Sequence, residues 1–335
     1  MPNDVKTHYR ACNLCEAICG LEIKTQGQQV MSIKGDKNDP LSRGYICPKG
    51  TAMEDVYTDP DRLRYPVKRK GDQWVQIDWD EAFNTVAERL VAVQQRYGAD
   101  TVAVYAGNPN VHNYGSMTHG GIFRKTLGSK SNFSATSLDQ LPLHLACYSL
   151  YGHQSLIPIP DIDHTQYMLI IGGNPLASNG SLMTVPDVPK RLKAIQQRGG
   201  RFVVIDPRRT ETAEIADQHL FIRPGTDAYL LMAMIQTLFA ENLVNSGHLN
   251  DLLEGVNEVQ AACLPFTPEL AEQHTGVAAE QIRQLARDMA NIEGAVCYGR
   301  MGVSVQVYGS LCQWAIQIIN ILTNSLDVPG GALAA

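Results

Sequence analysis

The sequence lacks any long hydrophobic run, and no stretch approaches the roughly 20 consecutive apolar residues that a membrane-spanning helix needs. Its first residues, Met1-Pro2-Asn3-Asp4, contain neither an apolar segment nor a pair of arginines. No export signal is visible, so we expect a cytoplasmic protein without a membrane segment. A large excess of positive charge is also missing, because 28 Lys and Arg residues stand against 34 Asp and Glu residues, a net charge of −6. This balance excludes nucleic-acid binding that depends on bulk charge.

The composition is typical of a globular protein, with 44% hydrophobic and 19% charged residues. A length of 335 residues predicts two or three domains. The charge is unevenly distributed: residues 1–70 hold 12 basic and 9 acidic side chains, an excess of +3, and the remaining residues hold 16 and 25, an excess of −9. A mildly basic N-terminal face could attract an acidic electron carrier, but an ordinary solvated surface would have the same balance.

The eight cysteines are also unevenly placed. Four fall within the first 47 residues, in the spacing Cys12-x2-Cys15-x3-Cys19-x27-Cys47. Three thiolates on one tight loop and a fourth from a distant turn suit a [4Fe–4S] cluster. Structural zinc is the alternative, but four-cysteine zinc sites favour two CxxC pairs, which this spacing does not provide. Disulfides are not expected in a cytoplasmic protein, so we predict that these four cysteines bind an iron–sulfur cluster.

The N-terminal 70 residues indicate a small, loop-rich module that a metal centre would stabilise. Alternating apolar and polar residues at 21–24 and 30–33, with a glycine turn between them, predict a β-hairpin. A helix is predicted from Trp79, with Asp80 as its N-cap. A short strand at 101–105 then leads into a glycine-rich stretch and a helix near residues 122–127.

Further along, one pattern repeats three times: an apolar strand followed by a polar loop rich in Gly, Asn, Asp or Pro. The strands are predicted at 167–171, 201–205 and 294–298, with helices at 188–198 and 311–322. Strands without polar alternation are buried on both faces, which predicts a parallel sheet covered by helices, an α/β fold. Ligands of such sheets bind at the carboxyl ends of the strands, and all three loops lie there.

Two motifs make a family resemblance specific. Residues 10–20 read Arg-Ala-Cys-Asn-Leu-Cys-Glu-Ala-Ile-Cys-Gly, and residues 44–50 read Gly-Tyr-Ile-Cys-Pro-Lys-Gly. They resemble the opening domain of the molybdopterin oxidoreductases, and the later strand–loop units match that family in order along essentially the whole chain. The resemblance implies a small β-rich Fe–S module at 1–70 and, at 71–335, Rossmann-like parallel-sheet domains whose main dinucleotide-binding loops lie at 160–300. It also implies three cofactors: a [4Fe–4S] cluster, Mo or W, and bis-molybdopterin guanine dinucleotide.

The same resemblance implies roles for individual residues. Lys49 would help to pass electrons between pterin and cluster, although a solvated surface lysine is the alternative. The residues expected to hold the dinucleotides follow the strands: Gly173, Asn174, Pro175 and Asn179, with Ser181 as a softer candidate; Asp206, Pro207, Arg208 and Arg209; Gly225, Thr226 and Asp227; and Gly299, Arg300, Met301 and Gly302, followed by Gln306 and Gly309. Glycine lets a backbone approach phosphate, arginine pairs with phosphate, and Asp206 and Asp227 could accept from ribose or guanine. Ordinary capped loops, with Asp227 as a helix N-cap, are the alternative.

The protein ligand of the metal is not defined by the sequence. The resemblance places it before the first dinucleotide loop, where Cys147 is the one cysteine. A thiolate suits Mo or W, whereas a cysteine among apolar neighbours suits the core; Tyr148 follows it where formate dehydrogenases have histidine. His144 could be a substrate-side acid or base, or a satisfied polar residue on a helix, and His112 and His119 are open in the same way. Three further cysteines are expected to be buried thiols: Cys263, Cys297 and Cys312.

These features predict a redox enzyme similar to formate dehydrogenases and nitrate reductases. A small-molecule substrate would react at Mo or W, and electrons would pass through the cluster to or from an external carrier, such as a ferredoxin-like protein or an Fe–S subunit. The alternative is an electron-relay or scaffold relative that keeps the cluster without the metal–pterin. Because the family typically continues through a further domain, we expect an N-terminal portion that holds its pterins incompletely.

Overall fold

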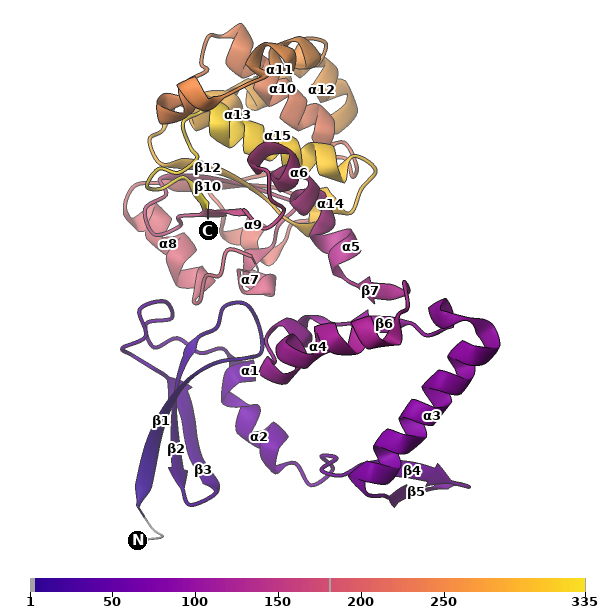
Figure 1. The fold of residues 1–335 in the computed structure, drawn as a ribbon. Helices are drawn as coiled ribbons and strands as arrows, with labels where there is room; N and C mark the ends of the chain where they lie inside the picture. Colours follow the sequence, from indigo (N-terminus) through magenta and orange to yellow (C-terminus); the bar gives the residue numbers. More distant parts are fainter. Residues whose placement is uncertain (1–3, 181, 335) are drawn as a thin grey trace. The chain divides into compact units, whose positions relative to one another are not determined.

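The computed structural model describes residues 4–180 and 182–334. The chain divides into two compact units, unit 1 (residues 1–135) and unit 2 (residues 136–335), whose elements are labelled in Figure 1. The domain boundary predicted after residue 70 stays a prediction. In the described part of the chain, no helix combines the length and the apolar character needed to cross a membrane.

Unit 1 begins with a three-stranded antiparallel sheet in the order β1-β2-β3, formed by β1 (Val5–Ala11), β2 (Gly20–Gln26) and β3 (Gln29–Gly35). The β2–β3 pair is the predicted hairpin. The first strand was missed, because nearly all of its residues are exposed and it lacks an apolar pattern. Its register pairs Ala11 with Gly20, so the two strand ends bring Cys12 beside Cys19. Two short helices follow the sheet: α1 (Pro48–Thr51) and α2 (Met53–Thr58).

The rest of unit 1 holds two longer helices and two small sheets. Its elements are the hairpin of β4 (Val67–Lys70) and β5 (Gln73–Gln76), helix α3 (Trp79–Tyr97), the short helices η1 (Ala99–Thr101) and η2 (Asn108–Val111), helix α4 (Tyr114–Leu127), and the parallel pair β6 (Val104–Ala106) and β7 (Asn132–Ser134). The helix predicted from Trp79 is confirmed, but its predicted N-cap is wrong. The side chain of Asp78, not Asp80, accepts a hydrogen bond from the Glu81 backbone N–H at 2.7 Å.

Unit 2 is built on a four-stranded parallel sheet in the order β11-β10-β9-β12. Its strands are β9 (Tyr167–Ile171), β10 (Arg201–Ile205), β11 (Gln218–Leu220) and β12 (Ala295–Gly299). The register places Ile171 beside both Ile205 and Gly299, so the carboxyl ends of the three longer strands are level. Every residue of β9 and β12 is buried. The predicted parallel sheet is therefore confirmed. Strand β11 was not predicted, because three residues are too few to show a pattern of apolar residues.

Helices cover both faces of this sheet (Figure 1). Helices α8 (Val188–Gln197) and α9 (Glu211–Ile215) contact β10, whereas α13 (Ala279–Asn291) and α15 (Gly309–Leu322) contact β12. The other elements of unit 2 are α5 (Thr136–Asp139), α6 (Leu141–Tyr151), α7 (Pro175–Ser178), α10 (Asp227–Ala240), η3 (Gly247–Leu252), α11 (Val256–Cys263), α12 (Pro268–Thr275), α14 (Met301–Ser304), and an antiparallel pair of β8 (Pro158–Pro160) and β13 (Ala332–Ala334). One apolar core spans the sheet and its helices.

Candidate functional site

The four predicted cluster ligands of unit 1 lie on two short segments. Cys12 and Cys19 are buried and joined through their backbones, because the Cys12 N–H donates to the Cys19 carbonyl at 2.8 Å. Cys15 lies on the loop between them and is half-buried, as is Cys47, which is the N-cap residue of α1. The loop turns tightly at Ile18, whose φ of 38° is rare for a β-branched residue. Such strain persists where the surroundings impose it, commonly at functional sites.

A small polar network, which the sequence did not predict, fixes the segment around Asp39 and Ser42 against the cysteine loop. The carboxylate of Asp39 accepts from the Ser42 backbone N–H at 2.6 Å and from the Ser42 hydroxyl at 2.7 Å. These hydrogen bonds lower the pKa of Asp39. The buried Ser42 Oγ also accepts from the Gly20 backbone N–H at 3.0 Å, next to Cys19. An Asp three residues before a Ser is a local turn signal that could have been recognised, and here it holds the segment that leads to Cys47.

The four thiols interact electrostatically. Burial is the main cause that raises the pKa of Cys19 to about 11, and the neighbouring Cys12, Cys15 and Cys47 raise it further. Burial also raises the pKa of Cys12, which the Leu14 backbone N–H and the Lys49 ammonium oppose. Lys49 therefore acts on the predicted ligand set from its exposed position on α1.

This donor set fits a four-iron cluster. Such clusters are held by four cysteine thiolates, and Cys12, Cys15 and Cys47 lie close enough to Cys19 to raise the pKa of its thiol. The thiols are also partly enclosed by apolar side chains such as Leu21, Ile33 and Ile46, which limits access of water.

In unit 2, the loops that follow the sheet strands meet at one edge. Gly172, after β9, has a φ of 57°, and a methyl group on it would lie 2.7 Å from the Val303 backbone nitrogen. The Gly302 N–H donates to the Gly172 carbonyl at 2.9 Å. At the end of β12, a Cβ on Gly299 would lie 2.2 Å from Ile316. At Gly172 and Gly302, glycine is therefore required by close backbone packing between the two loops, as well as by any approach to phosphate.

The side chain of Asn174 ties the first loop to the second. Its Nδ2 donates to the Glu211 carboxylate at 2.6 Å, and its Oδ1 accepts from the Thr212 hydroxyl at 2.7 Å. Both ends of this amide are thus engaged inside the protein, so its role is to position the loop after β9. Pro175 begins α7 and Asn179 ends it, with a left-handed φ of 56°. Ser181 lies outside the described residues.

A buried acidic side chain and an amide lie together beside this edge. Asp227 is 6% exposed, and Gln306 Nε2 donates to its Oδ2 at 2.8 Å. Burial raises the pKa of Asp227, and the charge of Asp206 adds to that effect. The oxygen of the same amide, Gln306 Oε1, is buried without a hydrogen-bond partner. Asp227 is the first residue of α10 and not its N-cap, which is Thr226.

This arrangement fits a ligand that donates hydrogen bonds. An orphaned buried acceptor has an energetic cost, and a bound donor would remove it. Asp206, directly after β10, accepts from the Arg208 backbone N–H at 2.8 Å, and Arg208 and Arg209 are exposed. The edge therefore presents acceptors beside cations, as a nucleotide requires.

The loop after β12 contributes a partly buried ion pair. Arg300 is 9% exposed, and its Nη2 contacts Asp139 Oδ1 at 3.2 Å. Asp139 ends α5, a helix that sequence reasoning did not connect with this edge. Met301, next in the chain, is half exposed. Arg300 is thus fixed by protein contacts, and Met301 is free to meet a ligand.

The predicted metal ligand lies inside the protein. Cys147 is completely buried on α6, which packs against α15, and burial raises the pKa of its thiol to about 11. This environment supports the alternative of a core thiol. His144 is half-buried on the same helix, and burial lowers its pKa, which favours the neutral ring. Three cysteines are buried as predicted: Cys263, Cys297 and Cys312.

The two histidines of the glycine-rich stretch lie in unit 1. His112 is largely buried, with its Nε2 4.0 Å from a Glu16 carboxylate oxygen, close to the cluster loop. His119 is exposed on α4, where its Nδ1 lies 2.7 Å from the Thr118 hydroxyl. For both histidines, the two predicted roles, a substrate-side acid or base and a satisfied polar residue, stay predictions.

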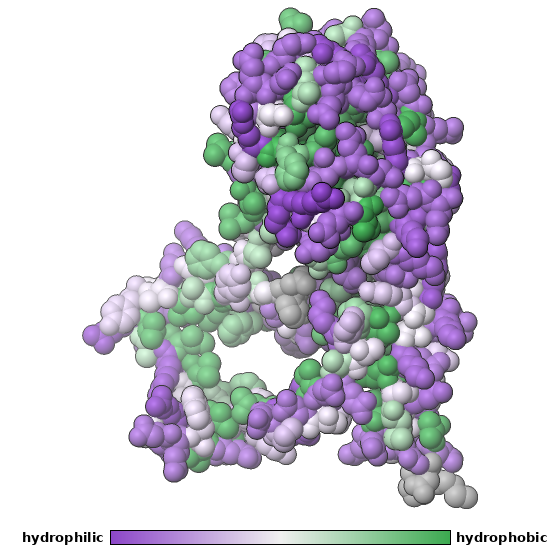
Figure 2. All heavy atoms as spheres, turned by 180° about the vertical axis from the view of Figure 1, so that it is seen from behind, coloured by the Kyte–Doolittle hydropathy of each residue, from purple (hydrophilic) through white to green (hydrophobic). Residues whose placement is uncertain are grey.

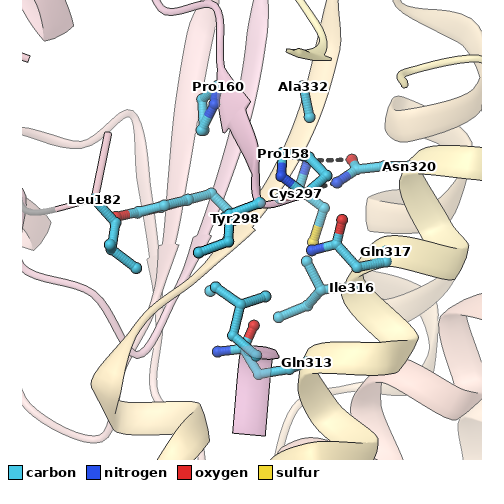
Figure 3. A pocket seen from close by; sticks show the side chains of 13 residues that line it. Pro158, Pro160, Leu182, Cys297, Tyr298, Gln313, Ile316, Gln317, Asn320 and Ala332 are labelled. Carbon is cyan, nitrogen blue, oxygen red and sulfur yellow. Dashed lines mark hydrogen bonds between the residues drawn. The ribbon is translucent and has the colours of Figure 1, made fainter. Parts of the chain in front are cut away.

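A small cavity lies behind β12 (Figure 3). Polar side chains of α15 line it, and Asn320 bonds both backbone groups of Cys297, accepting at 2.8 Å and donating at 2.9 Å. Its volume of about 20 Å³ suits about one water molecule. A dinucleotide is far larger than this cavity.

Two family models match the chain. The molybdopterin oxidoreductase Fe4S4 domain matches residues 5–58, and the molybdopterin oxidoreductase model matches residues 62–333. The chain belongs to the molybdopterin oxidoreductase family. Membership confirms the predicted resemblance and implies an Fe4S4 cluster and a molybdopterin, for which the donor sets of both units are suited.

Individual relatives of the family share the sequence at a moderate level. Formate dehydrogenase H of Escherichia coli is 27% identical over 95% of this chain and 44% of its own length. A nitrate reductase of Symbiobacterium thermophilum is 27% identical over 96% of this chain and 43% of its own length. The structure of acetylene hydratase from Pelobacter acetylenicus superimposes with a TM-score of 0.78 and 25% identity, over 98% of this chain and 45% of that one. The chain thus spans less than half the length of these family members, and their names refer to three different substrates.

Proposed function

We propose that the protein is an oxidoreductase that uses Mo or W held by bis-molybdopterin guanine dinucleotide and exchanges electrons through a [4Fe–4S] cluster. The single observation that carries this proposal is that one chain combines four neighbouring thiols in unit 1 with four loops that converge at one sheet edge in unit 2. When bound, the metal–pterin supplies two-electron chemistry on a small-molecule substrate, and the cluster supplies one-electron exchange with an external carrier.

The residues of unit 2 would bind the dinucleotides by complementary hydrogen bonding. Asp227 and the free oxygen of Gln306 form a pair of acceptors, which suits the two adjacent N–H donors on the Watson–Crick edge of guanine. The exposed Arg208 and Arg209 would pair with phosphate, and Asp206 would accept from ribose. The remaining proposed contacts come from the same loops: Gly173, Pro175 and Asn179; Pro207, Gly225 and Thr226; and Gly299, Met301 and Gly302. The side chains of Asn174 and Arg300 are held by protein contacts and would position these loops.

The residues of unit 1 would hold and tune the cluster. Cys12, Cys15, Cys19 and Cys47 supply the four thiolates, and the Lys49 ammonium offsets part of their negative charge. A positive charge at this place favours the reduced cluster, so Lys49 would set the potential at which electrons pass. An external carrier, either a ferredoxin-like protein or an Fe–S subunit, would complete the electron path.

The protein ligand of the metal is left unassigned in this proposal. Cys147 is completely buried, as expected of a core thiol, and burial favours the neutral ring of His144, which could accept a proton or a hydrogen bond. The substrate is not assigned either, because the relatives are named for formate, nitrate and acetylene.

The proposal is tested by watching the cluster during turnover. The protein is purified without oxygen from the cells that produce it, and formate, nitrate, thiosulfate and N- or S-oxides are added in turn. One of these compounds is expected to reduce the cluster or to oxidise the prereduced cluster, seen as gain or loss of its electron paramagnetic resonance signal. A cluster that responds to dithionite but to no substrate, in protein without Mo or W, would instead establish an electron-relay subunit.

A further inference from the structure

An aromatic ring of unit 2 is exposed at the sheet edge where the nucleotide is proposed to bind. Phe221 directly follows strand β11 and is 60% exposed. The other three phenylalanines of unit 2 are buried or half-buried. The face of unit 2 in the upper part of Figure 2 is mostly hydrophilic. Single exposed apolar residues are nevertheless common on protein surfaces, so exposure alone gives this ring no role.

The strand register places Phe221 beside Asp206. Ile205 of β10 pairs with Leu220 of β11. The residues that follow them, Asp206 and Phe221, are therefore the next neighbours along the carboxyl edge of the sheet. The Asp206 N–H donates to the Leu220 carbonyl at 3.2 Å, which continues the pairing past the ends of the strands. Phe221 thus lies about one strand spacing from the carboxylate that is proposed to accept from ribose.

His219 contacts both the Phe221 ring and the Asp206 backbone. Its ring centroid lies 4.3 Å from that of Phe221, and the two ring planes are inclined by 57°. Its Nε2 donates to the Asp206 carbonyl at 3.0 Å. Leu220 and Ile222 are buried, so His219 and Phe221 lie together on the other side of the strand. The histidine therefore supports the Phe221 ring while much of that ring stays exposed.

The acceptors proposed for guanine lie close to this ring. Burial is the main cause that raises the pKa of Asp227, and the charge of Asp206 raises it further, so the two carboxylates are near each other. Gln306 Nε2 donates to Asp227, and its Oε1 is buried without a hydrogen-bond partner. The loop between Phe221 and Asp227 borders open space, because a methyl group on Gly225 would meet no atom within 4 Å. One edge thus combines an exposed ring, hydrogen-bond acceptors and room for a ligand.

We propose that Phe221 is a stacking platform for the guanine base of a nucleotide bound at this edge. The inference rests on the proposed function, which assigns the guanine edge to Asp227 and Gln306 but gives the flat faces of the base no partner. Hydrogen bonds at its edge orient a base within its own plane, whereas an aromatic side chain covers one of its faces. Phe221 would supply contact area, and the two acceptors would supply selectivity for guanine.

Binding of GDP to the full chain tests this role. The chain is produced in cells that do not make molybdopterin, so that the nucleotide site is free, and the dissociation constant is measured by isothermal titration calorimetry. Phe221→Ala is expected to weaken GDP binding about tenfold, because it removes the stacking contact of one base. Phe221→Tyr keeps an aromatic ring and is expected to bind GDP within about threefold of the parent chain. Equal affinities of Phe221→Ala and the parent chain would overturn the proposal.

Two further variants separate this inference from the proposed function. Phe133→Ala, at a phenylalanine of unit 1 that is 56% exposed, is the matched control and is expected to leave the GDP affinity unchanged. Asp227→Asn removes a carboxylate acceptor and is expected to weaken GDP binding. If Asp227→Asn weakens binding and Phe221→Ala does not, the nucleotide site stands and the stacking platform is wrong. If the parent chain binds no GDP, the nucleotide site and the platform both fail.

A fluorescence measurement keeps the test independent of the stability of Phe221→Ala. Phe221→Trp retains an aromatic ring, and a guanine base stacked on an indole quenches its emission. Saturating GDP is therefore expected to lower the emission of Phe221→Trp more than that of the parent chain, whose tryptophans are Trp74, Trp79 and Trp314. An equal change in the two proteins would overturn the proposal.

Discussion

A methyl group on Gly172 would lie 2.9 Å from the Cα atom of Gly302, and one on Gly302 would lie 2.7 Å from the Cα atom of Gly172. The loops that follow β9 and β12 therefore touch backbone to backbone. This contact fixes the sheet edge at which the dinucleotide is proposed to bind, because neither loop can move without displacing the other.

Gly172→Ala is expected to destabilise unit 2 strongly. The substitution combines overpacking against Gly302 and Val303, worth about 1–3 kcal/mol, with a left-handed φ that costs about 1 kcal/mol more. Gly199→Ala is the matched control, since Gly199 also has a positive φ but open space around it, and only the second cost applies. The free energies of unfolding in urea compare the two variants. Equal losses would contradict the close contact.

Asp227→Asn is expected to change how stability depends on pH. Burial raises the pKa of Asp227, so the folded protein keeps this proton to a higher pH than the unfolded chain does. Ionisation of Asp227 therefore lowers the free energy of unfolding as the pH rises from about 4 through the raised pKa. The asparagine variant cannot ionise, so its free energy of unfolding does not fall for this reason. We expect the variant to gain roughly 1 kcal/mol at pH 7 and nothing near pH 3.

Unfolding in urea across this pH range measures that difference. The control is Asp72→Asn, at a fully exposed carboxylate, which is expected to leave the pH dependence unchanged. A difference between Asp227→Asn and the parent protein that stays constant from pH 3 to pH 7 would contradict the prediction.

Cys147→Ala is expected to affect stability and not metal content. Its side chain is completely buried on α6, so its removal leaves a small cavity and costs roughly 1–2 kcal/mol. The holoprotein purified from its own cells should keep its Mo or W. Cys263→Ala, at another fully buried thiol, should behave alike. Loss of Mo or W in the Cys147 variant alone, at unchanged stability, would identify Cys147 as the metal ligand after all.

Much of this architecture could be predicted from the sequence. The apolar strands of unit 2 are specified by buried runs such as 167–171, and the cysteine spacing alone indicated the cluster module. The N-cap of α3 was misplaced by two residues, because Asp78 and Asp80 are chemically equivalent candidates and only the backbone geometry distinguishes them.

The contacts that organise the site could not be predicted in this way. Asn174 looks like a ligand residue in the sequence, yet its amide is held by Glu211 and Thr212, 37 and 38 residues away. The pairing of Asp139 with Arg300, 161 residues apart, depends equally on the tertiary fold. Local patterns carry no information about partners at such separations.

Lys49→Ala is expected to lower the reduction potential of the cluster without loss of iron. The Lys49 ammonium acts on the Cys12 thiol, and removing one solvent-screened positive charge makes reduction less favourable. We expect a shift of roughly 20–60 mV, the size of about 0.5–1.4 kcal/mol for a one-electron couple. A redox titration followed by electron paramagnetic resonance measures it. Lys24→Ala, at an exposed lysine paired with Glu22, is the control, and an equal shift there would remove the special role of Lys49.

The central claim is that one protein combines the cluster of unit 1 with a metal–pterin at the sheet edge of unit 2. The most direct measurement is elemental and nucleotide analysis of protein purified without oxygen from its own cells, together with Cys47→Ser. We predict about four irons per chain, Mo or W, and guanine nucleotide released by acid, with iron lost in Cys47→Ser. Four irons without Mo or W, or one zinc in place of the irons, would contradict the account.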